Sequence, residues 1–101
     1  MAEVILHNAG AYNLYNTISD GAHFVSALTL DQLRYYIQRE YGDAGLKALP
    51  ARLERAHTTG TSDPEAESLE EFLISNQAGA NGETLSCADF VQKFLTIVPT
   101  A

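Results

Sequence analysis

The chain has 101 residues, 46% of them apolar and 9% aromatic, and its 13 acidic residues against six Lys and Arg give a formal net charge of −7. This length fits one domain, residues 1–101, whose single core should fold without a metal ion or a cross-link. The negative charge disfavours direct binding to nucleic acid or anionic lipid, and the lone Cys87 together with the absence of a secretion signal or membrane span predicts a cytoplasmic protein.

Residues 3–28 are rich in Val, Ile, Tyr, Thr and Phe, and two turn-forming clusters, Asn8-Ala9-Gly10 and Ser19-Asp20-Gly21, interrupt them. This pattern predicts a small N-terminal antiparallel sheet, a three-stranded meander over residues 3–7, 12–18 and 23–28. Asp20-Gly21 would supply the positive φ of a tight hairpin.

The same segment also carries a helical pattern, which leaves an alternative open. Ala11, Leu14, Tyr15 and Ile18 stand at helical intervals, and two Asn residues weaken the strand interpretation. If that pattern prevailed, the fold would be an all-α bundle.

A helix is predicted to begin after Thr29, because Thr29 and Gln32 match a capping box. Gly42 stands where a helix-ending glycine is expected, and Asp43 can cap the next helical segment. Pro50 lacks an amide proton and should kink or divide that segment. The apolar positions of the two segments are Leu30, Leu33, Ile37, Tyr41, Leu46, Leu49, Leu53 and Ala56.

Residues 57–63 are polar and predict a linker, with Pro64 at the first position of a further helix that runs to about residue 76. Residues 76–86 predict a loop, and Ser86 with Asp89 predicts the start of a last helix that Pro99 ends. Its apolar face would hold Phe90, Val91, Phe94, Leu95 and Val98. The whole pattern predicts an α+β fold in which three to four helices cover the sheet.

The sequence contains no recognised catalytic or metal-binding pattern around its three histidines, His7, His23 and His57. Asp20 and His23 flank the proposed hairpin turn and are close enough in sequence to interact. Cys87 begins the last helix but lies on its apolar face, so a buried structural thiol is expected rather than a nucleophile. We therefore expect no enzyme activity and no cofactor.

The stretch from Asn76 to Asp89 joins two predicted helices, as a calcium-binding loop does. With Gly82 at the glycine position of such a loop, Gln77, Gly79 and Asn81 would take the first three ligand positions and Ala88 the last. Because the carboxylates are missing, an ordinary loop is expected and no metal site.

Charge is segregated along the chain. Residues 1–33 contain no Lys or Arg, residues 34–55 hold five of the six, and residues 56–101 carry seven carboxylates against Lys93. On a helical wheel, Glu67, Glu70, Glu71 and Ile74 share a side opposite Leu69, Phe72 and Leu73. This side predicts either a solvated face or a surface for a basic partner, where the carboxylates steer and Ile74 adds apolar contact.

Tyr35 and Arg39 are aligned with Asp31 on the outer side of the capped helix, and Tyr and Arg are the residue types that often anchor interfaces. A Tyr–Arg contact within the helix would explain the same spacing without a partner. Lys47 and Arg55 are too few for a nucleic-acid footprint.

These observations favour a small acidic non-enzymatic binding protein, an adaptor, regulator or inhibitor, which engages a protein partner with a basic surface. One alternative is a nucleic-acid-mimicking inhibitor of a nucleic-acid-binding enzyme. Another is a small enzyme or ligand carrier in which Tyr12, Tyr15, His23 and Phe24 line a pocket. A homo-oligomer built on exposed aromatic side chains is also open.

Overall fold

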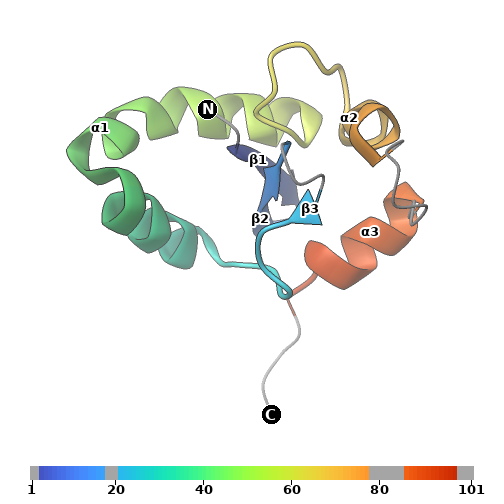
Figure 1. Cartoon of the computed structure of the whole chain (residues 1–101), viewed down its shortest axis with the longest axis horizontal. Coiled ribbons are helices and arrows are strands. Elements are labelled where there is room, and N and C mark those ends of the chain that lie inside the picture. The colour runs from blue at the N-terminus through green and yellow to red at the C-terminus, as the bar shows by residue number, and fades with distance from the viewer. Residues whose placement is uncertain (1–2, 18–20, 78–85, 98–101) are drawn as a thin grey trace.

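The computed structural model describes residues 3–17, 21–77 and 86–97. Its elements are β1 (Glu3–Asn8), β2 (Ala11–Asn16), β3 (Gly21–Ala22), α1 (Leu30–Thr59), α2 (Leu69–Gln77) and α3 (Cys87–Phe94) (Figure 1). The three strands form one antiparallel sheet in the order β1-β2-β3. The predicted α+β fold with a three-stranded meander is therefore confirmed, and the helical alternative for the second segment is wrong.

The hairpin between β1 and β2 follows from its turn. Ala9 and Gly10 both have positive φ, 47° and 81°, as the central residues of the tight turns that match strand twist do. Asn8 pairs with Ala11 across this turn, and the register continues through His7 opposite Tyr12. The first predicted turn is thus confirmed.

The third strand is much shorter than predicted, and a strand over residues 23–28 is wrong. Beyond β3, the backbone of this segment bonds to β2 only at its two ends: the His23 amide donates to the Leu14 carbonyl at 2.7 Å, and Tyr12 and Leu28 form an isolated bridge. The side chain of Asn13 explains the interruption, because its Oδ1 accepts from the Phe24 amide at 3.2 Å and its Nδ2 donates to the Phe24 carbonyl at 2.9 Å. Asn13 is fully buried, so its amide takes the place of ladder hydrogen bonds. The predicted Asp20-Gly21 turn lies partly outside the described residues.

Both faces of the sheet are covered by helices, because both sets of alternating strand residues are apolar. Ile5, Tyr12 and Leu14 pack with α1, whereas Leu6 and Tyr15 pack with α2 and α3. Figure 1 shows the same arrangement, with α1 curving around one side of the sheet and α2 and α3 on the other. The first half of α1 and helix α2 therefore lie on different faces of the sheet.

The start of α1 is the predicted capping box. The Gln32 amide donates to Thr29 Oγ1 at 3.2 Å, and the Thr29 amide donates to Gln32 Oε1 at 2.8 Å. Gly42 has φ 63° and ψ −153°, so it kinks α1 where the sequence predicted an end, and the helix then continues to Thr59.

Pro50 does not divide the helix, contrary to the prediction. It lies on the exposed side of α1, while Leu49, Leu53 and Ala56 are buried against the sheet. Burial of that apolar stripe is worth more than the hydrogen bond that Pro50 lacks. Gly60 then ends the helix with φ 94°, so the polar linker begins later than predicted.

The prediction that a helix starts at Pro64 is also wrong. The preceding segment runs along β1 instead, where the Ser62 amide donates to the Ile5 carbonyl at 2.8 Å and the Ile5 amide donates to Ser62 Oγ at 2.9 Å. Helix α2 begins only after Ser68, whose hydroxyl accepts from the Glu71 amide at 3.0 Å. Pairing with the open edge of β1 thus delays the helix.

Helix α3 begins as predicted, because Ser86 Oγ accepts from the Asp89 amide at 3.2 Å. The predicted loop over residues 76–86 lies almost entirely outside the described residues, as do Val98 and Pro99. None of the helices in the described segments is both long enough and apolar enough to cross a bilayer.

Candidate functional site

The carboxylates predicted to bind a partner are exposed side chains of α2 and of the residues before it: Glu70 and Glu71 stand in the first turn of the helix, and Glu67 precedes it. We call Glu67, Glu70, Glu71 and Ile74 the acidic surface. All three carboxylates are exposed, and Ile74 is 65% exposed, whereas Phe72 on the same helix is buried. Within the described parts of the chain, no Lys, Arg or His forms an ion pair with these three glutamates. The acidic surface therefore presents unneutralised charge beside an apolar side chain.

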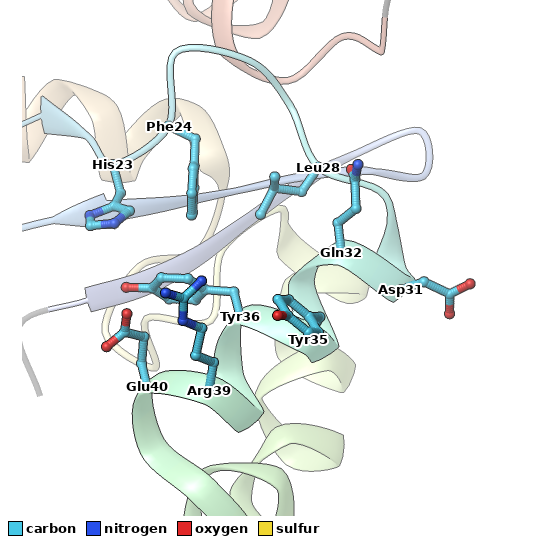
Figure 2. Close-up of a pocket in the computed structure, with 9 residues that line it drawn as sticks. All are labelled: His23, Phe24, Leu28, Asp31, Gln32, Tyr35, Tyr36, Arg39 and Glu40. Carbon is cyan, nitrogen blue, oxygen red and sulfur yellow. The ribbon is translucent and has the colours of Figure 1, made fainter.

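Tyr35 and Arg39 line a groove on the opposite helix layer. We call it the α1 groove; it is open to solvent and has a volume of about 620 Å³. Figure 2 shows its two walls, one formed by the first half of α1 and the other by the segment that follows β3. Its lining residues are His23, Phe24, Leu28, Asp31, Gln32, Tyr35, Tyr36, Arg39 and Glu40.

The six predicted partner-binding residues thus form two separate surfaces. Tyr35 and Arg39 belong to α1 and the acidic surface belongs to α2, and these helices cover opposite faces of the sheet (Figure 1). A partner would have to reach around the sheet to contact both.

Three packed aromatic rings form the floor of the α1 groove. The rings of Phe24 and Tyr36 meet edge to face with centroids 5.1 Å apart, and the His23 ring lies 4.6 Å from Phe24 and 5.3 Å from Tyr36. Tyr35 stands at the rim and is 66% exposed. The groove therefore combines packed aromatic rings with one large aromatic side chain that is mostly exposed.

The carboxylate of Glu3 contacts residues from both walls of the groove, His23 and Tyr36. It accepts hydrogen bonds from the hydroxyls of Tyr36, at 3.0 Å, and of Tyr41, and it lies 3.2 Å from His23 Nδ1. The Glu3 side chain is only 10% exposed. Arg52 Nη2 donates to the Glu3 carbonyl at 3.0 Å. Strand β1, the segment after β3 and both halves of α1 are thus joined at one residue.

Burial and hydrogen bonding shift the pKa values of Tyr36, Tyr41 and Arg52 in this cluster. Burial, followed by the hydrogen bond to Glu3, raises the pKa of Tyr36, and the hydrogen bond to Glu3 is the main cause that raises the pKa of Tyr41. Burial lowers the pKa of the Arg52 guanidinium. Both hydroxyls therefore stay protonated and hold Glu3 as donors.

Sequence reasoning missed this cluster. It paired His23 with Asp20, which lies outside the described residues, whereas the structure pairs His23 with Glu3. Its members are Glu3, His23, Tyr36, Tyr41 and Arg52. They come from separate parts of the chain, so no local spacing could have shown the cluster. The one available signal was Glu3 itself, a carboxylate directly before the apolar residues Val4, Ile5 and Leu6 of the predicted strand.

The aromatic pocket considered for an enzyme or carrier is only partly formed. His23 and Phe24 line the α1 groove, but Tyr12 and Tyr15 are buried on opposite faces of the sheet and do not line it. Tyr12 instead shares a hydrogen bond of 2.6 Å with His57 Nε2.

A second polar cluster lies at the hairpin turn. His7 and His57 have ring centroids 4.6 Å apart, and His7 Nε2 accepts from the Gly10 amide at 3.1 Å. Burial is the main cause that lowers the pKa of His7, and the charge of His57 lowers it further. The arrangement stabilises a neutral His7 that fixes the turn.

Cys87 is half-buried against the core that α2 and α3 share. Burial, together with the nearby Glu70 carboxylate, raises the pKa of its thiol, so the nucleophilic thiolate is disfavoured. In the described ranges, no three side chains of His, Cys, Asp or Glu are grouped closely enough to hold a metal ion.

Comparisons of the chain with protein-family models, with curated proteins and with solved structures give no match.

Proposed function

We propose that this chain is a non-enzymatic binding protein, an adaptor, regulator or inhibitor in the cytoplasm, which engages a protein with a basic surface through Glu67, Glu70, Glu71 and Ile74. The observation that supports it is the exposure of Ile74 among three carboxylates that no described cation neutralises. An exposed apolar side chain on the same short helix as exposed carboxylates fits the composition of an interface that has an apolar centre and a polar rim.

The carboxylates and Ile74 are expected to contribute to binding in different ways. Exposed ion pairs are each worth only about 0.2–1 kcal/mol, so the carboxylates act mainly on the association rate and on partner choice. Burial of the Ile74 side chain supplies the apolar part of the affinity, about 1–2 kcal/mol at its present exposure. Binding should accordingly weaken as salt concentration rises.

The test is affinity capture from an extract of the source cells with the wild-type chain and two neutralised variants. Glu70→Gln/Glu71→Gln removes charge from the acidic surface. Asp43→Asn/Glu54→Gln removes the same charge from exposed positions of α1 and is the matched control. Proteins retained by wild type and control but lost with the first variant support the proposal.

The captured protein is then purified and its affinity measured directly, with Ile74→Ser as a third variant. The proposal predicts a basic binding region on that protein and weaker binding for both Ile74→Ser and Glu70→Gln/Glu71→Gln. Equal affinity for all variants would refute it.

A further inference from the structure

The α1 groove is a second candidate surface that the acidic surface does not use. Tyr35 lines this groove and is 66% exposed, which makes it one of the most exposed large apolar side chains in the described part of the chain. Tyr is a residue type that often anchors interfaces, and here it stands beside further aromatic lining residues.

The floor of the groove is already organised for binding. The backbone of Phe24 is held on both sides by Asn13, and the Tyr36 hydroxyl is held by Glu3. Little side-chain freedom is left to lose there when a partner covers the rings, which lowers the entropic cost of association.

Charge selects the kind of occupant. Asp31 and Glu40 stand on the walls, the Glu3 carboxylate lies behind His23 and Tyr36, and Arg39 is the only Lys or Arg among the described lining residues. Carboxylates combined with the faces of aromatic rings attract a cation that has an apolar stem. The net charge of −7 adds attraction in the same direction.

From this charge and shape we infer that the α1 groove binds a basic amphipathic polypeptide segment, with an apolar side chain on Phe24 and Tyr36 and Lys or Arg side chains beside Asp31 and Glu40. The inference rests on the proposed function in that both take a basic polypeptide as the partner. The binding surface is a different one. A polypeptide fits better than an enclosed small molecule, because the groove is open to solvent and lies between two walls (Figure 2).

The effect of Arg39 on affinity has a direction that tests the inference. As the single cation in the lining, it opposes a basic occupant, so Arg39→Gln should strengthen binding by about two- to fivefold. Tyr35→Ala should weaken binding about tenfold, because it removes the exposed ring. Asp31→Asn/Glu40→Gln should weaken it by about two- to fivefold per charge.

The experiment uses a short amphipathic Leu/Lys peptide, a Leu/Glu peptide of the same pattern and free arginine as probes of the full chain. Binding is followed by calorimetry and by amide chemical shifts in NMR spectra. The expected result is binding of the Leu/Lys peptide alone, with shifts at His23, Phe24 and Tyr35, and no effect of Glu70→Gln/Glu71→Gln on that affinity.

Each other outcome has a distinct meaning. Shifts confined to α2 overturn the inference and leave the proposed function standing, whereas shifts at the groove that Glu70→Gln/Glu71→Gln does not change support the inference and leave the acidic surface to its own test. Equal binding of the Leu/Glu peptide, or a stronger response to free arginine than to the peptide, overturns the inference. No binding of the Leu/Lys peptide at low salt also overturns it.

Discussion

The Tyr12 hydroxyl and His57 Nε2 share a hydrogen bond of 2.6 Å that ties the sheet to the last turn of α1. His7 lies against both rings, with centroids 4.9 Å from Tyr12 and 4.6 Å from His57. The hairpin turn, the sheet and the end of the long helix therefore depend on one group of side chains that includes two imidazoles.

The free energy of unfolding should fall as the pH is lowered far enough to protonate His7. The pKa of His7 is lower in the folded chain than its ordinary value, chiefly through burial, so the unfolded chain binds the proton more readily. The stability that a neutral His7 contributes is present above about pH 6.5 and is lost progressively below it. Urea unfolding at a series of pH values near neutrality measures the effect, and His7→Gln should flatten it. An unchanged pH slope in that variant would contradict the assignment.

Removal of the Glu3 carboxylate should destabilise the fold. Glu3→Ala leaves the hydroxyls of Tyr36 and Tyr41 without their acceptor, at a cost of about 1–3 kcal/mol for each hydroxyl that stays buried. Glu3→Gln keeps an acceptor oxygen and should cost less. Chemical denaturation measures both.

The same variants give a spectroscopic check. Because the hydrogen bond to Glu3 is the main cause that raises the pKa of Tyr41, this pKa should fall toward its ordinary value in Glu3→Ala. A tyrosinate absorbance titration that is the same in wild type and variant would show that the carboxylate does not hold the hydroxyl.

Gly42 should not tolerate a side chain. Its φ of 63° with ψ of −153° lies in a region that only glycine enters readily, so Gly42→Ala should cost about 1–3 kcal/mol although no atom lies within contact of the added carbon. Gly21→Ala is the matched control, because Gly21 has equally open surroundings and no positive φ. Equal loss of stability in the two variants would refute a backbone origin.

Asn13 should control the order of the groove wall. In Asn13→Ala the amide and carbonyl of Phe24 lose their partners, and so does the Phe94 carbonyl, which accepts from Asn13 Nδ2 at 3.0 Å. Hydrogen exchange should become faster over residues 21–28 while the amides of β1 and β2 stay protected. Uniform acceleration across the sheet would mean that Asn13 supports the whole fold rather than this wall.

The features that sequence could predict are those set by neighbouring residues. The capping box of Thr29 with Gln32 and the cap by Ser86 depend on side chains three positions apart, and the structure contains both. The turn at Gly10 and the break at Gly42 follow from backbone angles that glycine adopts easily. The acidic surface is likewise local, since all its residues lie between Glu67 and Ile74 in the sequence.

The predictions failed where a side chain forms hydrogen bonds with the backbone of a residue distant in sequence. Asn13 captures Phe24 and ends the third strand, and Ser62 pairs with Ile5 and delays α2. The Glu3 cluster and the α1 groove require contacts between β1, the segment after β3 and both halves of α1. Hydrophobic periodicity carries no information on such contacts, so the groove could not be foreseen although Tyr35 and Arg39 were identified.

The central claim is that the acidic surface binds a basic protein, and the most direct measurement is the salt dependence of affinity for the captured partner. Wild type should bind more weakly as salt rises, and Glu70→Gln/Glu71→Gln should bind more weakly at low salt with a shallower salt dependence, whereas Asp43→Asn/Glu54→Gln should behave as wild type. The same affinity and the same salt dependence for both variants would contradict the claim.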